Sequence, residues 1–361
     1  MELKRFIIRV FVFAAVFVLA GELFFRFVVP ASRGPYQARD DKYQILKMDI
    51  GRHKEGRFTV GRFARHRFRW TINDQGWNSD IEFLPRDRRQ TGCIAMVGAS
   101  YVEGFYVDVD RTLPAELSKA IGSGWDVYNL GKSGVNAAQS VLVARYTRDV
   151  FEPDVYVFVM NHGAIRSSVR DFGYLAFNSQ YKTAGDGLEE LPPSVYTPNP
   201  ITRNMRESAI LSYLWMNRKA IRGFQAIRQE AKQKSGDDAS MSWERERPIL
   251  EMAADRIVAA LRHDHPGARL LVVTDADRHT LYETGKRPDP LNTSVLFEEA
   301  CRNHGVGFLD LTDAFADDYA VHRRRFNFDE DYHWNGYGIE IVTREIVRYL
   351  QDKNILLNPE E

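Results

Sequence analysis

Residues 93–104 read Cys-Ile-Ala-Met-Val-Gly-Ala-Ser-Tyr-Val-Glu-Gly, and this stretch decides the fold. Its first five residues form an apolar run of the kind that makes a buried strand. The turn that follows places the hydroxyl of Ser100 directly beyond the end of that strand. Open α/β sheets bind their ligands outside the carboxyl ends of their strands, so a reactive group is expected at this position.

From residue 93 onward, apolar runs alternate with segments of helical periodicity. We predict strands over residues 93–97, 125–129, 153–160, 268–274 and 306–311. We predict helices over residues 112–121, 247–263, 293–304 and 337–351. Strands that alternate with helices indicate an α/β fold with a parallel sheet covered by helices on both faces.

A second reactive segment lies near the C-terminus, where residues 329–336 read Asp-Glu-Asp-Tyr-His-Trp-Asn-Gly. Serine is a weak nucleophile until a base takes its proton, and the base works best when a carboxylate fixes its tautomer. His333 is the candidate base for Ser100. Either Glu330 or Asp331 is able to reach the imidazole from a loop, and we favour Asp331.

Two further segments follow predicted strands. Gly134 ends a short turn after the strand at 125–129, and Asn161 follows the strand at 153–160. A backbone N–H and a side-chain amide are both suitable donors to the oxyanion that forms during acyl transfer. Because Ser100, Gly134 and Asn161 all follow the carboxyl ends of strands, we expect them at the same edge of the sheet.

Together these segments resemble the sequence blocks of the SGNH/GDSL hydrolases, which are serine esterases and acyl-transfer enzymes on a flavodoxin-like sheet. Four segments carry the resemblance, namely Gly98-Ala99-Ser100 with Gly104, Asn129 to Gly134, Met160-Asn161, and Asp331 to Asn335. The resemblance covers about residues 91–345. It implies a catalytic triad of Ser100, His333 and Asp331, and an oxyanion hole of Ser100, Gly134 and Asn161. It implies no metal and no cofactor.

The sequence departs from the family pattern at three positions. Ala99 stands where the family has an Asp before the nucleophile, and His162 follows Asn161 where an Asp is usual. The usual triad acid lies three residues before the histidine, which is Glu330, whereas Asp331 lies two before it. That shorter spacing, the Thr71-Ile72-Asn73 segment and the apolar N-terminus resemble the membrane-anchored bacterial members.

Each segment also has a plainer interpretation. Gly-x-Ser by itself is common in surface turns, and Asn161 is a residue type that caps helices. His263-Asp264-His265 resembles a metal pair, but no third ligand accompanies it in the sequence. The four segments in the right order, each at a strand end, favour the catalytic interpretation over these alternatives. Trp334 and Tyr101 either line the acyl pocket or only pack beside it.

The N-terminal segment, residues 1–30, is expected to be a membrane anchor. Its longest uncharged stretch, Val10 to Gly21, is shorter than the roughly 20 residues of a spanning helix, but Glu22 and Arg26 are spaced to pair and the apolar character resumes after them. A cleavable signal peptide is the alternative, since Val18-Leu19-Ala20 fits a cleavage site. We favour a single-pass anchor in the inner (cytoplasmic) membrane.

The remainder divides into two regions. Residues 31–90 form a polar, β-containing extension, and residues 91–361 form the hydrolase-like domain with an insertion at about 165–245. An insertion directly after an active-site strand often forms a lid or a substrate wall. The insertion contains a predicted helix over residues 205–234, which either covers the active site or packs on the sheet.

Composition excludes other classes of function. Lys plus Arg and Asp plus Glu both number 49, so there is no global field to attract nucleic acid. The two cysteines, Cys93 and Cys301, cannot form a disulfide framework.

We therefore expect an extracytoplasmic (periplasmic) serine esterase that acts on small O-acyl esters, such as acetyl esters of a carbohydrate, through an acyl-enzyme. The expected partners are an acylated glycan or small ester as substrate and the membrane through residues 1–30. Two alternatives are an O-acyltransferase, with a sugar hydroxyl in place of water, and an inactive glycan-binding descendant, which the Ala99 and His162 departures leave open.

The anchor leads to a prediction about topology. A periplasmic-type reporter fused after residue 361 is expected to be active, because Lys4 and Arg5 hold the N-terminus on the cytoplasmic side. The full-length protein is expected to stay with membranes through a high-salt wash. Release into the soluble fraction with an N-terminus at Gly21 would contradict the anchor and favour a cleaved signal peptide.

Overall fold

A computed structural model describes residues 2–60, 62–197, 199, 205–214, 236–329 and 331–356, without the side chains of residues 62 and 236–242. The chain divides into two compact units. Unit 1 contains residues 1–34, 56–69 and 197–236, and unit 2 contains residues 35–55, 70–196 and 237–361. The reactive segments found in the sequence all belong to unit 2.

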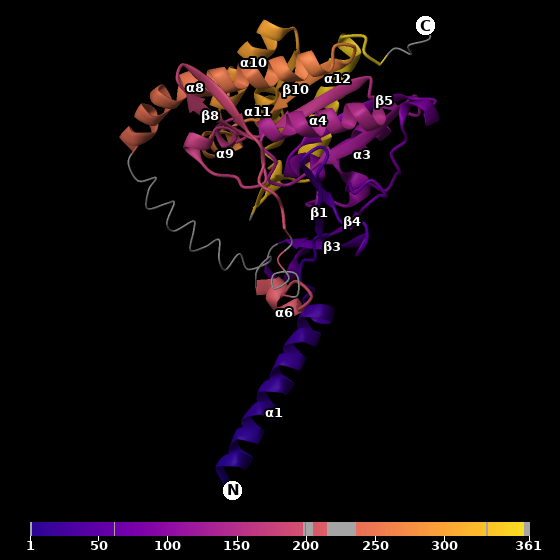
Figure 1. Cartoon of the computed structure of the whole chain (residues 1–361), viewed down its shortest axis with the longest axis vertical. Helices are drawn as coiled ribbons and strands as arrows, with labels where there is room; N and C mark the ends of the chain where they lie inside the picture. The colour runs from indigo at the N-terminus through magenta and orange to yellow at the C-terminus, as the bar shows by residue number, and fades with distance from the viewer. Residues whose placement is uncertain are drawn as a thin grey trace. The chain divides into compact units, whose positions relative to one another are not determined.

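Unit 2 is built on a five-stranded parallel sheet (Figure 1). Its strands are β5 (Gly92–Gly98), β6 (Trp125–Gly131), β7 (Val155–Met160), β10 (Arg269–Thr274) and β11 (Gly307–Asp310). They lie in the order β11-β10-β7-β5-β6. Counted along the chain, this is the 2-1-3-4-5 order of flavodoxin-like sheets. The predicted fold class and all five predicted strands are confirmed.

Helices cover both faces of the sheet (Figure 1). One face carries α4 (Ala137–Phe151), α8 (Gly236–Asp264) and α10 (Asn292–His304). The other face carries α2 (Ser100–Glu103), α3 (Leu113–Ile121), α9 (Arg278–Thr284), α11 (Thr312–His322) and α12 (Gly336–Asp352). Alternate residues of β5 serve the two layers: Cys93, Ala95 and Val97 face the first, and Ile94 and Met96 face the second. A strand buried on both faces reads as a continuous apolar run, as residues 93–97 do.

The register of the sheet brings three strand ends to one place. Gly98, at the end of β5, pairs with Gly131 of β6 on one side and with Val159 of β7 on the other. Helix α2 follows at once and packs tightly against the end of β6. A Cβ on Gly131 would lie 2.0 Å from the backbone nitrogen of Glu103, so no larger residue fits there without displacing the backbone.

Short antiparallel hairpins lie outside the sheet. In unit 2 they are β1 (Gln37–Asp40) with β2 (Ile45–Met48), β8 (Gln180–Ala184) with β9 (Gly187–Leu191), and β12 (Asn327–Phe328) with β13 (Asp331–Trp334). Single-turn helices link these elements at Arg86–Arg88, Val109–Arg111, Arg166–Ser168 and Arg170–Phe172. The β12–β13 hairpin is short, but it carries both candidate residues of the C-terminal segment.

Unit 1 contains the apolar N-terminal helix. Helix α1 (Glu2–Leu23) continues as a π-helical turn, η1 (Phe24–Val28), and its side chains are not buried within the protein (Figure 1). The 27 residues Glu2–Val28 are long and apolar enough to cross a membrane, with a mean hydropathy of 2.3 in their most apolar window. Both a membrane anchor and a signal sequence have this property.

The end of this helix is tied to the other segments of unit 1. The Glu22 carboxylate accepts hydrogen bonds from the Ala209 backbone N–H at 2.8 Å and the Ser208 hydroxyl at 3.0 Å, at the start of α6 (Ala209–Ser212). Phe25 stacks on Tyr213 with ring centroids 4.3 Å apart. Unit 1 also holds the single turn Arg62–Ala64 and most of the hairpin β3 (Glu55–Val60) with β4 (His66–Thr71).

Helical periodicity in the sequence predicted only some of the observed helices, whereas the apolar runs predicted all five strands of the sheet. The four predicted helices are confirmed, although α8 begins at Gly236 rather than at residue 247. Helices α2, α4, α9 and α11 were not predicted. Of the helix predicted over residues 205–234, the structure describes α6, and residues 215–235 lie outside the described part of the chain.

Candidate active site

Ser100 and His333, 233 residues apart in the sequence, are in direct contact. Ser100 is the first residue of α2, directly beyond the carboxyl end of β5. Its Oγ lies 2.6 Å from Nε2 of His333. This is hydrogen-bond distance for a hydroxyl and an imidazole, so His333 is placed to take the proton of the serine.

Asp331 holds the other side of the imidazole. Its Oδ1 is in hydrogen-bond contact with Nδ1 of His333 and also accepts the His333 backbone N–H at 3.0 Å. The Asp331 side chain is 7% exposed and that of His333 is 22% exposed. A carboxylate at Nδ1 keeps the proton on that nitrogen and leaves Nε2 as the acceptor that faces the serine. Glu330, the alternative acid, lies outside the described residues.

A buried network of polar groups supports the hairpin that carries Asp331 and His333. Arg278, at the start of α9, pairs with Asp275 at 2.8 Å, and both side chains are about 5% exposed or less. The Arg278 guanidinium donates to the backbone carbonyl of Tyr332 at 2.7 Å and to the Tyr101 hydroxyl at 2.8 Å. These bonds tie the residue before His333 to the residue after Ser100.

Two aromatic residues proposed as pocket walls take part in this network. Trp334 is 2% exposed and donates from its indole N–H to Asp275 at 3.1 Å, so it packs beneath the site rather than lining it. The Tyr101 hydroxyl donates to the Tyr332 carbonyl at 3.1 Å. Burial, and secondarily the charge of Asp275, raises the pKa of Tyr101 above its usual range, which keeps this phenol protonated as a donor.

Tyr106 is a contact of the histidine that the sequence did not reveal. Its ring stacks on the His333 imidazole with centroids 3.7 Å apart and planes 9° from parallel. The parallel stack holds the imidazole plane against the Tyr106 ring. Tyr106 lies six residues after Ser100 in an irregular segment, so no helical or strand periodicity predicts its contact with His333.

The two expected oxyanion donors flank Ser100 at the edge of the sheet. Gly134 follows β6, has a φ of +83° and is solvent-exposed, with open space where a Cβ would stand. Asn161 directly follows β7, and its Oδ1 accepts the Gly163 backbone N–H at 3.0 Å. Because an amide is planar, this bond turns the Asn161 Nδ2 donor away from Gly163. β5 lies between β6 and β7, so both loops leave the sheet beside Ser100.

The side chain of Asn178 fixes the Gly134 turn. Its Nδ2 donates to the Gly134 carbonyl at 3.1 Å, and its Oδ1 accepts the Asn136 backbone N–H at 2.9 Å. A backbone donor is useful in catalysis only when its direction is fixed before the charge develops. Asn178 contributes to that rigidity from a segment outside the sheet.

Glu103 restrains the same turn from beneath. Its side chain is 1% exposed and forms an ion pair with the buried Lys132 at 3.3 Å. The second carboxylate oxygen accepts the Ser133 backbone N–H at 2.9 Å and contacts the Ser133 hydroxyl. One carboxylate, one helical turn after Ser100, therefore holds the two residues that precede Gly134. In the sequence Glu103 is only a polar residue before a glycine, so its role could not be read there.

Ala99 and His162 lie beside the candidate site without taking part in the contacts described above. Ala99 is 7% exposed, and its carbonyl accepts the Val102 and Glu103 backbone N–H groups at the start of α2. The His162 side chain is exposed, and its carbonyl accepts the Thr293 hydroxyl at 2.7 Å. Neither substitution removes an atom that the contacts among Ser100, His333 and Asp331 require.

The described residues offer little to a metal ion. Among them, no group of three or more His, Cys, Asp or Glu side chains is arranged to hold one. His265, from the His-Asp-His segment, is buried with its ring nitrogens facing the carbonyls of Leu261 and Ala144. Burial lowers the pKa of His265.

No protein-family model matches the sequence, and no curated protein matches it. Several solved structures are similar at low identity. A two-domain esterase (CEX) active on acetylated mannans matches with 12% identity and a TM-score of 0.40, over 73% of this chain and 49% of that one. TesA matches with 10% identity and a TM-score of 0.40, over 73% of this chain and 99% of its own.

A carbohydrate acetylesterase family member from Sinorhizobium meliloti matches with 11% identity and a TM-score of 0.35, over 74% of this chain and 99% of that one. At these values the similarity does not bear on function. The functional assignment depends instead on the geometry of the site.

The position of Asp331 generates a prediction about the acid. Asp331→Asn is expected to lower kcat for ester hydrolysis by about 10³–10⁴-fold, because the amide no longer fixes the tautomer or stabilises the imidazolium. Steady-state kinetics of the purified protein would measure this. Glu330→Gln is the matched control and should leave most of the activity. The reverse order of losses would transfer the role to Glu330.

The buried ion pair generates a second prediction. Glu103→Gln is expected to lower kcat by about tenfold to 10³-fold with little change in KM, because the Gly134 turn loses a charged acceptor and the oxyanion donor loses its fixed direction. Glu116→Gln, at a surface carboxylate on α3 paired with Lys119, is the control.

Loss of stability must be separated from loss of activity in this case, since Glu103→Gln leaves the Lys132 charge buried without a partner. Glu103→Gln with Lys132→Met removes both charges and is expected to recover the melting temperature but not kcat. Recovery of kcat together with the melting temperature would assign Glu103 to folding alone.

Proposed function

We propose that this protein is a serine esterase that acts on small O-acyl esters of a carbohydrate. The observation that carries the proposal is the continuous contact from Asp331 through His333 to Ser100, with Nε2 and Oγ 2.6 Å apart. A serine in a surface turn or a structural histidine does not require a buried carboxylate at the far ring nitrogen. This arrangement also supports catalysis over an inactive binding role.

The reaction begins when His333 Nε2 accepts the Ser100 proton and Oγ attacks the ester carbonyl. The tetrahedral intermediate places its negative charge between the backbone N–H groups of Ser100 and Gly134 and the amide of Asn161. His333 then gives its proton to the departing alcohol oxygen, the carbon–oxygen bond of the ester breaks, and an acyl-enzyme remains on Ser100.

Water completes the cycle. His333 takes one proton from the water as its oxygen attacks the acyl carbonyl, and returns that proton to Ser100 Oγ as the carboxylic acid leaves. The same acyl-enzyme transfers its group to a sugar hydroxyl if that hydroxyl takes the place of water. Product analysis with and without a glycan acceptor separates hydrolysis from transfer.

The proposed location is the periplasmic side of the inner membrane. The uncleaved α1 helix would serve as the anchor, and the contacts of Glu22 with Ser208 and Ala209 support its retention as a built part of unit 1.

The proposal is tested at the nucleophile. Ser100→Ala is expected to abolish hydrolysis of 4-nitrophenyl acetate and labelling by a serine-reactive phosphonate, while the melting temperature changes little because a methyl replaces a hydroxyl at a partly exposed position. Ser118→Ala, at a partly exposed serine on α3, is the control and should still label. Near-wild-type turnover by the Ser100 variant would overturn the proposed function.

A further inference from the structure

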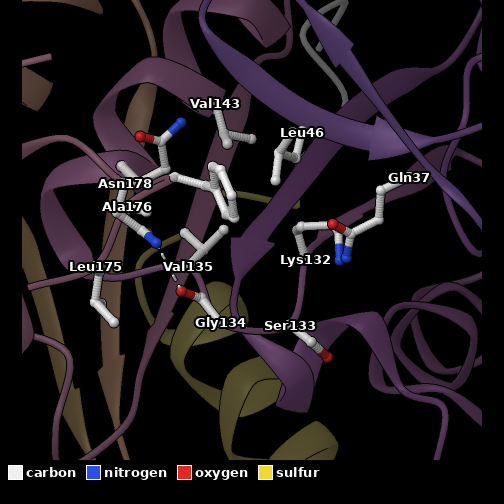
Figure 2. A pocket seen from close by; sticks show the side chains of 12 residues that line it. Gln37, Leu46, Lys132, Ser133, Gly134, Val135, Val143, Leu175, Ala176 and Asn178 are labelled. Atoms are coloured by element: carbon white, nitrogen blue, oxygen red, sulfur yellow. Dashed lines mark hydrogen bonds between the residues drawn. The ribbon is translucent and has the colours of Figure 1, made fainter. Parts of the chain in front are cut away.

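A cavity of about 240 Å³ lies beside the Gly134 turn in unit 2 (Figure 2). One wall is the turn itself, residues 132–135, and its floor includes Gln139 and Val143 of α4. Gly134 thus belongs both to this cavity and to the loop edge next to Ser100. Nothing in the reaction described above uses the rest of the cavity.

Two segments outside the βα framework complete the cavity. The β1–β2 hairpin contributes Gln37 and Leu46, and residues 175–178 contribute the opposite wall. The first belongs to the polar extension that precedes the sheet, and the second belongs to the insertion that follows Asn161. Figure 2 shows Gln37 and Leu46 on one side of the space next to Gly134, and Ala176 and Asn178 on the other. Both the β1–β2 hairpin and residues 175–178 therefore line the cavity.

The lining of the cavity has no net charge that would attract a charged ligand. Lys132 is the one charged residue that lines it, and the buried Glu103 carboxylate already neutralises that ammonium group. A phosphate or carboxylate ligand would need an unneutralised cation or a set of converging N–H donors. The lining instead combines a neutral polar group, the Gln37 amide, with apolar surface.

The apolar part of the lining includes an exposed aromatic ring. Phe177 is 40% exposed, and its ring is supported edge-on by Tyr196 with centroids 5.2 Å apart. Leu46 and Val143 line the cavity farther from the Gly134 turn, and both are partly or fully buried. An aromatic face beside planar amides suits a ligand with one apolar and one hydroxylated surface.

Size narrows the choice of ligand. The cavity is smaller than the roughly 300–1,000 Å³ of most sites for drug-sized ligands, so a long acyl chain would not be enclosed. A pyranose ring is neutral and compact, with C–H groups on its faces and hydroxyls at its rim. Among the expected substrates it matches the lining in charge, size and polarity.

We propose that this cavity is a carbohydrate subsite, which binds one sugar unit of a glycan while a neighbouring unit presents its O-acyl group to Ser100. The sugar would stack on Phe177 and exchange hydrogen bonds with the Gln37 amide. The proposal rests on the proposed esterase function and specifies its substrate as an oligomeric glycan rather than an isolated acetylated sugar. It also gives the extension and the insertion a shared role in substrate selection.

Asn178 connects this subsite to the reacting end. It lines the cavity and donates from Nδ2 to the Gly134 carbonyl, so a sugar seated against residues 175–178 would steady the turn that carries the oxyanion donor. Contacts to a distant sugar unit would then help to hold the Gly134 N–H in position in the transition state. Such contacts raise kcat as well as lowering KM.

The test compares Phe177→Ala with the wild-type full-length protein on two substrate classes. The first is a panel of O-acetylated oligosaccharides of four sugar units from mannan, xylan and chitin, and the second is 4-nitrophenyl acetate. We expect kcat/KM for the best oligosaccharide to fall by about five- to tenfold in Phe177→Ala and to be retained in Phe177→Trp. Turnover of 4-nitrophenyl acetate, which has no sugar, should change less than twofold.

Tyr174→Ala is the matched control, because Tyr174 is an aromatic residue of the same segment that is 57% exposed and does not line the cavity. It should leave both substrate classes unchanged. An equal loss on both classes in Phe177→Ala, or no loss on either, would overturn the subsite. Better turnover of longer acyl esters by that variant would assign the cavity to the acyl chain instead.

The outcomes also separate the subsite from the esterase function. If 4-nitrophenyl acetate is turned over through Ser100 but no oligosaccharide in the panel has a higher kcat/KM than the corresponding O-acetylated monosaccharide, the subsite is wrong and the esterase stands. If Ser100 neither turns over the aryl ester nor reacts with the phosphonate, the esterase function itself is wrong.

Discussion

The pairing of β5 with both β6 and β7 is the constraint on which the active site depends. Gly98 pairs with Gly131 on one side and Val159 on the other, so three loops leave the sheet at one point. Ser100 begins the middle loop, and Gly134 and Asn161 follow the strands that flank it. A slip of this register would separate Ser100, the proposed nucleophile, from both proposed oxyanion donors, and the alternation of apolar side chains toward two buried layers prevents such a slip.

The sheet brings the loops together, and buried polar groups then restrain the turn and the hairpin that carry the candidate site residues. Glu103 with Lys132 restrains the turn before Gly134, and Arg278 with Asp275 restrains the hairpin that carries His333. Buried ion pairs contribute little net stability, because desolvation of the charges opposes their attraction. Their value here is directional: the first pair joins α2 to the turn after β6, and the second orients Arg278, whose bond to the Tyr332 carbonyl holds the β12–β13 hairpin.

The segments outside the sheet contact two different parts of the protein. The β1–β2 hairpin and residues 175–178 meet at a cavity beside Gly134, whereas residues 205–214 are tied to the end of α1 through Glu22. The region between Asn161 and α8 thus contributes to both compact units. Its early part adds to the surface near the reacting end, and its later described part belongs with the apolar N-terminal helix.

The sequence by itself determined the class of fold, the five strands and the residues that meet at the catalytic edge. Short, continuous apolar runs, three of which are followed by a candidate site residue, are local signals, so they can be read from the residues alone. Helix α4 was missed because polar residues such as Gln139 and Ser140 are buried in it and obscure its apolar face.

Only the tertiary structure decided the contacts that join remote segments. Tyr106 against His333, Glu103 against Ser133, and Asn178 against Gly134 pair residues whose spacing follows no periodic rule. The placement of Asp331 at Nδ1 likewise depends on how the β12–β13 hairpin turns, because two adjacent carboxylates in a loop are equivalent until the backbone directs one of them. Such contacts are set by the packing of whole elements, and local sequence patterns carry no information about it.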